Sequence, residues 1–392
     1  MTQTEPAMIS IPRTTLLAES LAAFGSRREL AVYCGASTPL ELDARERETE
    51  ALASGAAVHD LGWMRRVEVR GEDRFRWLSG MVTNMVSDLA ANASAWNLVL
   101  NAQGRIQGDL WVWRDGDNVE LEIAADQFDK LLAHLNHFII MDDVELVPLE
   151  DQAAMGLTGP LAGDVLARVG LPSVPSLEDA LTQTRAVWNS AEIRIRRSYG
   201  AIARHYDLWA APSILQQLWS AVIHAGAAPV GFGSLDAFRI AEGMPLYGID
   251  MAERDLPQET SQMRAISFNK GCYLGQEIVE RIRSRGNVHR HLRQLELLGP
   301  APAQGTELFP ESIDTVPENA GARMDKPAGH ITSAASLPLA GGSRTFALAM
   351  IRAEAETGGR ALKYTSGSET GIARILSGPP NLTPESRGNK EP

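Results

Sequence analysis

The chain has 392 residues, of which 44% are hydrophobic and 22% charged, with 34 Gly, 21 Pro and two Cys. This composition excludes collagen-like, low-complexity and disulfide-rich proteins, and the length predicts two or three domains. The formal net charge of −12 argues against RNA or a membrane surface as a direct partner, although it does not exclude a local basic patch.

No apolar run approaches the roughly 20 residues that cross a bilayer, and the N-terminus lacks the pattern of a signal peptide, so a cytoplasmic protein is expected. Cys34 and Cys272 lie far apart and form no Cys-x-x-Cys pair, so neither a disulfide framework nor a structural zinc site is expected. His134 and His137 lack a further ligand at a suitable spacing, and no permanently bound metal is predicted.

The pattern of apolar residues predicts an N-terminal extension over residues 1–55, with a polar tail and then helix. A unit with both helices and strands follows. Its predicted elements are a strand at Val67 and Val69, a helix after Asp73, strands at Trp96–Asn101, Ile106–Arg114 and Val119–Ala124, a helix carrying Phe128 to Phe138, and a strand at Val144–Pro148.

A second unit of similar pattern runs from Ala153 to about Phe238. Its predicted elements are strands at Ala153–Leu157, Ile193–Arg197 and His205–Ala210, and helices at Leu161–Val169 and Pro212–Ala225. From about His291 onward, short apolar strands alternate with Gly and Pro turns, which predicts a small β-barrel or sandwich. The segment Gly299–Lys326 is expected to be a long surface loop, and residues 377–392 a disordered tail.

The densest cluster of unusual residues is KGCYLGQE, Lys270 to Glu277. The two glycines allow a tight turn, and a helix is expected to start near Gly275 with Glu277 paired to Arg281. The helix N-terminus and the ammonium group of Lys270 would both favour the thiolate form of Cys272, which makes this residue a candidate nucleophile, redox group or contact to a metal cluster. The alternative is a buried cysteine that acts as a small hydrophobic residue.

A run of basic residues follows this motif: Arg281, Arg283, Arg285, His289, Arg290, His291 and Arg293. It could bind a carboxylate, a phosphate or RNA. The equally simple alternative is a solvated helix face that is balanced by acidic neighbours.

KGCYLGQE resembles the signature of the folate-binding YgfZ family, a branch of the superfamily that includes the aminomethyltransferase (T-protein) of glycine cleavage. Similar stretches are FRIAEGMPLYGIDMAERDLPQET at 238–260, ISFNKGC, LNAQGRIQGDLWVWRDGD and the ending AGHITSAASLP…FALAMIR, so the resemblance spans about residues 58–376. It implies an α+β fold with three domains in a cloverleaf and a folate in a central channel. The implied boundaries are a folate-binding region at 56–285, built from two interleaved ferredoxin-like units (about 56–151 with 239–285, and about 152–238), and a C-terminal β-barrel at 286–376.

The resemblance further implies a protein that binds tetrahydrofolate or a derivative and supports assembly or repair of iron–sulfur clusters in client enzymes. Cys272 would be the functional thiol, in transient contact with client or assembly proteins, because protein iron–sulfur sites normally use four cysteines. The remaining motif positions would hold it in place: Lys270, Gly271, Tyr273, Gly275, Gln276 and Glu277, with Arg281 lining an anionic site. The implied folate contacts are Trp63, Asp109, Leu235 and Tyr247.

Two alternative functions remain open. The first is a tetrahydrofolate-dependent aminomethyltransferase. The T-protein uses the first aspartate of a paired-aspartate motif, and that position falls here on Gly108, while Asp109 is expected to point to the opposite face of its strand. This departure favours a binding protein over a classical enzyme. The second alternative is a protein related to tRNA modification that uses the basic run, which the negative net charge disfavours.

Overall fold

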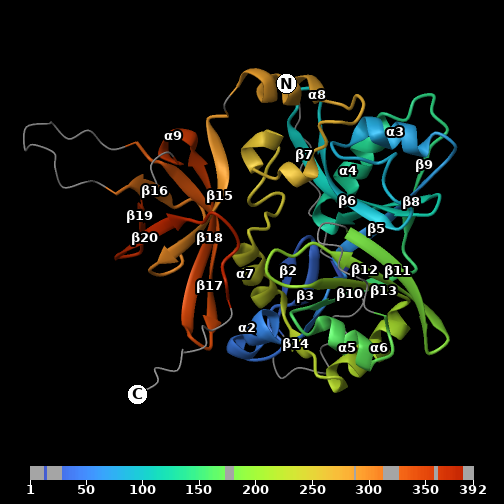
Figure 1. Cartoon of the computed structure of the whole chain (residues 1–392), viewed down its shortest axis with the longest axis horizontal. Coiled ribbons are helices and arrows are strands. Elements are labelled where there is room, and N and C mark those ends of the chain that lie inside the picture. The colour runs from blue at the N-terminus through green and yellow to red at the C-terminus, as the bar shows by residue number, and fades with distance from the viewer. Residues whose placement is uncertain are drawn as a thin grey trace, which may run out of the picture.

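A computed structural model describes residues 13–15, 29–172, 181–286, 288–311, 326–356 and 361–382. These residues form a large mixed sheet with helices on it and, beside it, a closed β-barrel at the C-terminal end (Figure 1). The predicted α+β fold with a C-terminal barrel is therefore confirmed. In the described part of the chain, no helix is long and apolar enough to span a membrane.

The large sheet has eleven strands in the order β14-β4-β10-β13-β12-β11-β6-β7-β8-β5-β9. The last five of these, which we call the first half, are accompanied by two helices; the bounds are β5 (Met64–Arg70), α3 (Arg74–Met81), β6 (Ala93–Leu100), β7 (Ile106–Asp115), β8 (Asn118–Ala124), α4 (Ala125–His137) and β9 (Glu145–Leu149). The other six form the second half, again with two helices; the bounds are β4 (Ala57–Asp60), β10 (Ala153–Thr158), α5 (Ala162–Arg168), β11 (Leu181–Trp188), β12 (Ala191–Ser198), β13 (His205–Ala210), α6 (Pro212–His224) and β14 (Ala228–Val230).

The two halves are joined at two places. Strands β11 and β6 pair through Leu181 with Ser94 and Thr182 with Ala93. In addition, only residues 61–63 connect β4 to β5, although these strands lie near opposite ends of the strand order. The sheet must therefore curl until its two ends approach each other, which encloses its inner face.

The two faces of the curled sheet differ in chemistry. Along β8, Leu121 and Ile123 pack into an apolar core with α3 and α4, whereas Glu120 and Glu122 point to the inner face. In β12, Ile193 belongs to a similar core under α5 and α6. Because side chains alternate between the two faces of a strand, one alternating sequence supplies both an apolar outer core and a polar interior.

The chain between the sheet and the barrel alternates helices with irregular segments. The helices are α7 (Phe232–Glu242), two short 3-10 helices at Pro257–Thr260 and Met263–Ala265, and α8 (Gln276–Arg285). Figure 1 shows α7 between the barrel and the sheet. Helix α7 ends at Gly243, whose left-handed φ of 73° closes the helix as a C-terminal glycine commonly does.

The barrel has the closed strand order β15-β18-β17-β16-β19-β20. Its elements are β15 (Arg290–Leu298), β16 (Glu307–Pro310), β17 (Gly329–Leu339), β18 (Gly342–Arg352), a single helical turn α9 (Ala353–Glu356), β19 (Leu362–Ser366) and β20 (Glu369–Ile375). Buried Leu295, Ile331 and Ala347 are part of the core that fills it.

Three predictions about the less regular segments were wrong in part. The described residues of the N-terminal extension form β1 (Arg13–Thr14), β2 (Leu30–Tyr33), β3 (Ala36–Pro39) and α2 (Arg45–Ser54), so strands precede the helix. The expected surface loop from 299 to 326 contains β16, and residues 312–325 of it lie outside the described residues. Leu382, in the expected disordered tail, is buried against the barrel and α7, whereas residues 383–392 lie outside the described residues.

Candidate functional site

A cavity of about 220 Å³ lies between the inner face of the sheet, α7 and the segment after α7. Its walls combine aromatic rings with ionisable groups. The aromatic residues are Tyr33, Trp63, Trp96, Trp111, Tyr199 and Tyr247; the ionisable ones are Cys34, His59, Asp109, Glu122, Asp126, His205, Asp207, Arg239 and Glu242.

The four residues proposed from the sequence as ligand contacts, Trp63, Asp109, Leu235 and Tyr247, all line this one cavity. They come from the loop before β5, from β7, from α7 and from the segment after it, so only the fold brings them together. Trp209 does not line the cavity: it is buried beneath the guanidinium groups of Arg66 and Arg196, which lie 5.1 and 5.5 Å from its ring.

Asp109 is the best-positioned acid in the cavity. The indole nitrogen of Trp96 donates to its Oδ2 at 2.8 Å, and the side-chain amide of Gln127 donates to its Oδ1 at 3.0 Å. The amide oxygen of Gln127 also accepts the backbone N–H of Asp109 at 2.9 Å, so one side chain fixes both parts of the residue. Burial raises the pKa of Asp109, although both side-chain hydrogen bonds oppose this shift.

The expectation that Asp109 points away from the site was wrong. Gly108 and Asp109 do face opposite sides of β7, but it is Gly108 that faces away from the cavity, toward α4. A Cβ at Gly108 would lie 2.8 Å from both terminal carbons of Leu131 and 2.7 Å from Oε1 of Gln127. The glycine therefore allows α4 to pack closely on β7, and the acid stands next to it.

Other polar groups surround Asp109. Burial raises the pKa of the Asp126 carboxyl, and the nearby charge of Asp109 raises it further. The ammonium group of Lys130 donates to the Tyr247 hydroxyl at 3.2 Å and pairs with Glu253 at 3.0 Å. Since carboxyls with raised pKa values and a hydroxyl meet here, this end of the cavity can exchange protons with a bound molecule.

A second polar cluster lines the cavity from β4, β13 and α7. His205 Nε2 forms an ion pair with Glu242 Oε2 at 2.9 Å, and His59 Nε2 lies 3.0 Å from the Thr158 hydroxyl. Burial alone would lower the pKa of His205, but Glu242 raises it above the ordinary value. Burial, with the nearby charge of Glu122, raises the pKa of Asp207, whose carboxylate accepts a hydrogen bond from Ser198.

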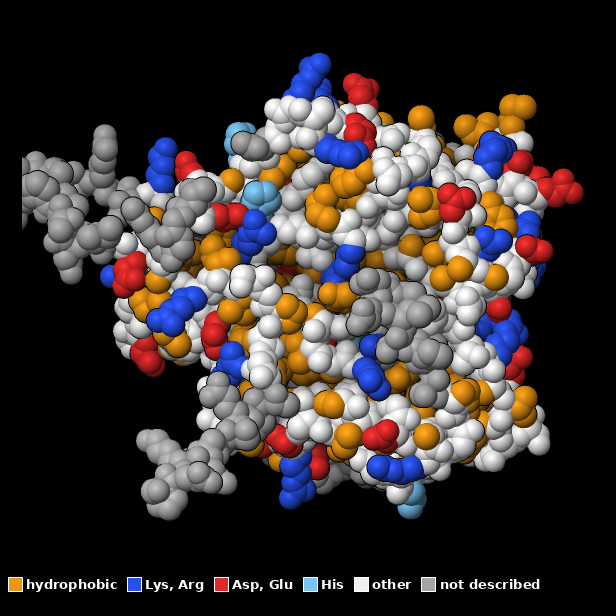
Figure 2. Space-filling view, viewed as in Figure 1, with side chains coloured by type: hydrophobic (Ala, Val, Ile, Leu, Met, Phe, Trp, Pro, Cys, Tyr) orange, Lys and Arg blue, Asp and Glu red, His pale blue; other side chains and the backbone are white. Residues whose placement is uncertain are grey.

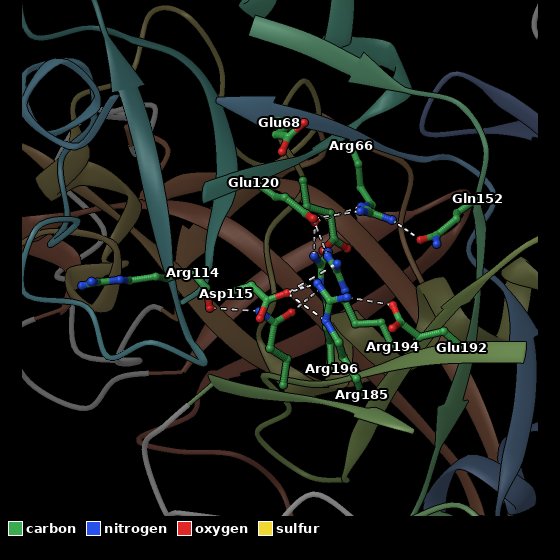
Figure 3. Close-up of polar contacts among 12 residues, drawn as sticks. Arg66, Glu68, Arg114, Asp115, Glu120, Gln152, Arg185, Glu192, Arg194 and Arg196 are labelled. Carbon is green, nitrogen blue, oxygen red and sulfur yellow. Dashed lines mark hydrogen bonds and ion pairs between the residues drawn. The ribbon is translucent and has the colours of Figure 1, made fainter. Parts of the chain in front are cut away.

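Beside the cavity, arginines and carboxylates of the inner face form a closed network (Figure 3). Arg66, Arg194 and Arg196 converge on Glu120, and Arg196 also binds Glu122 at 2.6 Å. Burial alone would raise the pKa of Glu120, but Arg196, Arg66 and Arg194 lower it to about 2. The network ties β5, β8 and β12 together, and each of its three arginines is paired with a glutamate.

The motif from Lys270 to Glu277 is mainly a packing motif. The Lys270 ammonium group donates to the backbone carbonyls of Ser79, Val82 and Asn84 at 2.8, 2.6 and 2.8 Å. It is thus held at the C-terminal end of α3 and the chain that follows, and it is not aimed at the thiol. Burial lowers the pKa of Lys270 to about 7.

Gly275 is required by a close approach of two backbones. Its φ is +81°, and a Cβ there would lie 2.5 Å from the carbonyl oxygen of Asn101 and 3.0 Å from Cα of Gly104. Tyr273 is buried, and its hydroxyl has no hydrogen-bond partner among the described residues. Burial and, to a smaller extent, the charge of Glu280 raise the pKa of Tyr273 to about 12. These residues dock the start of α8 on the β6–β7 turn.

Cys272 is exposed, beside the exposed Gly271, and it does not line the cavity. Helix α8 does begin after Gly275, as predicted. Gln276 opens the helix with its backbone N–H bound to Tyr273, but the predicted pair between Glu277 and Arg281 is absent from the described residues, where Arg283 pairs with Glu280 at 3.5 Å.

The basic run does not form one site. Arg290 pairs with Asp255 at 2.7 Å and with Glu259, and both His291 and Arg293 pair with Glu356. On the face seen in Figure 2, Lys and Arg side chains alternate with Asp and Glu side chains and gather in no single area. The described residues contain no group of three or more His, Cys, Asp or Glu that could hold a metal ion.

Several cavity residues were not found from the sequence, among them Gln127, His59, His205 and Asp207. Gln127 lies in the first turn of a predicted helix, and only its place next to Asp109 gives it a role. The one available signal was the pairing of acidic residues with apolar neighbours along β8 and β13, which indicates a polar interior face.

Comparisons with known proteins agree with this architecture. The profile of the family described as "GCVT N-terminal domain" matches residues 25–270. An aminomethyltransferase of Rubrobacter xylanophilus is 29% identical over 360 residues, which cover 90% of this chain and 91% of that protein. An aminomethyltransferase of Anoxybacillus flavithermus is 27% identical over 265 residues, covering 66% of this chain and 72% of that protein.

Among solved structures, the glycine cleavage system aminomethyltransferase T of Bartonella henselae has a similar fold. Its TM-score is 0.80 at 19% identity, with 95% of this chain and 99% of that chain covered. At this identity the likeness concerns the fold alone.

Proposed function

Because the chain belongs to the GCVT N-terminal domain family, we propose that it binds a tetrahydrofolate in the cavity and acts on a one-carbon unit, as an aminomethyltransferase-like protein. The observation that carries this proposal is Asp109, an acid with a raised pKa that is fixed by two hydrogen bonds and directed into an aromatic cavity. The relatives named aminomethyltransferase support the same class of reaction.

The residues of the cavity suit a reduced pterin. A pterin is a flat ring that stacks on aromatic side chains, and its 2-amino group and ring N–H donate hydrogen bonds that a carboxylate accepts. Trp96 and Trp111 offer stacked rings whose centroids lie 5.7 Å apart, and five acids line the same walls. We assign the binding of the ring to this combination, with Trp63, Leu235 and Tyr247 closing the other sides.

Asp109 would hold and move the proton of the reaction. Tetrahydrofolate supplies, when bound, the nitrogen that accepts the one-carbon unit. An acid whose pKa is raised toward neutrality can both donate and accept a proton there, which contributes roughly 10²–10⁴-fold to a rate. Trp96 and Gln127 keep its two oxygens in place, so the group needs no rearrangement before it acts.

The proposal is tested by binding and by turnover. We would measure the affinity for 5-formyltetrahydrofolate from quenching of tryptophan fluorescence, and the formation of methylenetetrahydrofolate from an aminomethyl donor. The variant is Asp109→Asn, which keeps the size of the side chain, and the control is Asp88→Asn at an exposed acid. We expect Asp109→Asn to lower turnover at least 100-fold while affinity changes less than tenfold, and Asp88→Asn to leave both unchanged.

Each outcome has a distinct meaning. If the wild-type protein does not bind the folate, the proposal fails as a whole. If it binds without any turnover, the one-carbon reaction is wrong and a folate-binding protein is left. If Asp109→Asn turns over as fast as wild type, the acid has no part in the chemistry.

We also propose a second candidate function, the YgfZ-like support of iron–sulfur enzymes, because one observation favours it. Around Cys272 the motif residues Lys270, Tyr273 and Gly275 have packing roles, whereas Cys272 itself is exposed. An exposed thiol without a packing role suits a transient contact with a client protein. The test is the activity of an iron–sulfur enzyme in a deletion strain complemented by wild type or by Cys272→Ser. Equal rescue by both proteins would reject a role for the thiol, and rescue by neither would reject cluster support.

A further inference from the structure

A second hollow adjoins the cavity and extends it toward the barrel. It has a volume of about 240 Å³ and shares Tyr199 and Glu242 with the cavity. Its other walls come from β15 and β18 of the barrel, from residues 376–379 after β20, and from the segment that carries Arg264. Glu242 at the end of α7 and Gly243 after it face the barrel residues Leu292 and Leu348 across this hollow. The two spaces therefore meet at Tyr199 and Glu242, which line both of them.

Arg264 forms part of the wall between the two spaces. Its guanidinium group lies 3.7 Å from the ring centroid of Tyr199 and 5.0 Å from that of Trp96. One terminal nitrogen contacts the sulfur of Met244 at 2.7 Å and the amide oxygen of Gln262 at 3.0 Å. The guanidinium group is thus held against two aromatic rings, and such a group can bind a planar anion through two parallel hydrogen bonds.

The charge of Arg264 lacks a matching carboxylate. Within the described ranges, no acidic group lies within 4.0 Å of it, and its Nε is buried without a hydrogen-bond partner. Glu242 is nearby, but its carboxylate pairs with His205 and accepts the backbone N–H groups of Ile202 and Ala203. By contrast, the arginines of the inner face and of α7 do pair with carboxylates, namely Arg66, Arg194, Arg196 and Arg239.

An uncompensated, half-buried guanidinium group beside a hollow is a site for an anion. Arginine binds carboxylates through two parallel hydrogen bonds, and a partly desolvated setting strengthens them. Arg293 lines the same hollow but already pairs with Glu356. The net positive charge of this hollow therefore comes from Arg264.

We propose that Arg264 is the anchor for a carboxylate on the acyclic tail of the molecule that the cavity holds, and so determines the affinity for the glutamyl form of the ligand. The inference rests on the proposed binding of a tetrahydrofolate, whose ring part is uncharged and whose glutamyl part carries carboxylates. The ring would lie in the cavity and the tail in the adjoining hollow, past Tyr199.

The experiment compares two ligands and four proteins. The ligands are 5-formyltetrahydrofolate and 5-formyltetrahydropteroate, which lacks the glutamyl group but keeps the same ring. The proteins are the full-length wild type, Arg264→Gln, Arg264→Lys and the control Arg293→Gln. Affinities come from titration calorimetry, and thermal unfolding verifies that each variant is folded.

We expect wild type to bind the glutamyl ligand at least tenfold more tightly than the pteroate, because a charge-assisted pair is lost with the tail. Arg264→Gln should abolish this preference while the affinity for the pteroate stays within twofold. Arg264→Lys should retain part of the preference, since it keeps the charge but loses the planar pair of donors. Arg293→Gln should keep all of it.

The results separate this inference from the proposed function. If wild type binds neither ligand, the proposed folate site fails. If wild type binds both ligands equally, or if Arg264→Gln weakens both by the same factor, the anchor is refuted while the folate site stands. If Arg293→Gln alone removes the preference, the anchoring residue is Arg293 and the assignment to Arg264 is wrong.

Discussion

Replacement of Lys270 by Met separates packing from chemistry in the motif that carries the family resemblance. The ammonium group of Lys270 donates to three backbone carbonyls, those of Ser79, Val82 and Asn84, at 2.6–2.8 Å. Methionine retains most of the length of the side chain and its apolar stem, so the change removes the donor group alone. The three carbonyls would then lose their partner at the end of α3.

The expected cost can be worked out from these contacts. A hydrogen bond from a charged donor contributes about 1.5–3 kcal/mol, and three of them set an upper range of roughly 4–9 kcal/mol. Two effects reduce this figure: Lys270 is only half-buried, so water can replace part of the loss, and burial of its ammonium group opposes folding. We therefore expect Lys270→Met to lower the free energy of unfolding by about 3 kcal/mol.

The assay is urea unfolding at pH 6, where the ammonium group is charged, with Cys272→Ser as the matched control from the same motif. Cys272 is exposed, so its replacement should change the free energy of unfolding by less than about 0.5 kcal/mol. A Lys270→Met protein that is as stable as wild type would refute the packing role. A loss above roughly 1 kcal/mol in Cys272→Ser would show that this cysteine also packs.

Three further changes test other parts of the structure. Gly108→Ala should destabilise the protein by about 1–3 kcal/mol in thermal unfolding, because the new Cβ would clash with Leu131. The control is Gly271→Ala, where no atom lies within 4 Å of the new Cβ. Equal stability of the two variants would contradict the close packing at Gly108. Burial lowers the pKa of His59 to about 3, below its unfolded value of about 6.5. The unfolded chain therefore takes up a proton that the folded protein does not, and the free energy of unfolding falls as the pH drops from 6.5 toward 3. In urea unfolding, wild type should lose about 2–3 kcal/mol more than His59→Gln between pH 7 and pH 4.5, and equal losses in the two proteins would refute this. Glu120→Gln removes the carboxylate that three arginines share and should cost about 3–5 kcal/mol in urea unfolding, whereas a loss below about 1 kcal/mol would mean that water compensates the arginines.

Local sequence patterns were sufficient for most of the sheet and the barrel, since alternation and helical spacing are local properties. The hairpin formed by β2 and β3 was missed for a physical reason. Its turn places Cys34 at a φ of 47° and Gly35 at 81°, and a cysteine is an unusual residue for the left-handed region. Strand β11 was missed as well, because its polar residues give no clear apolar alternation.

The site was predictable only in part. The resemblance supplied Trp63, Asp109, Leu235 and Tyr247, but the orientation of Asp109 depends on how closely α4 packs on β7, and no local pattern contains that distance. Lys270 was assigned to the thiol because it is adjacent in sequence. Its actual partners lie more than 180 positions away along the chain. Long-range backbone contacts of this kind leave no spacing signal.

The late position in the chain of both strands that pair with β4 has a consequence for synthesis of the protein on the ribosome. Strand β4 is completed at Asp60, but β10, against which it pairs, starts at Ala153. At a synthesis rate of roughly 5–20 residues per second, the first strand must wait on the order of 5–20 s for its neighbour, and β14 on its other side emerges later still. All four residues of β4 are buried in the finished protein. While residues 61–152 are being synthesised, the nascent chain therefore carries an unpaired strand that is prone to aggregate. We expect a chaperone to matter most during this interval.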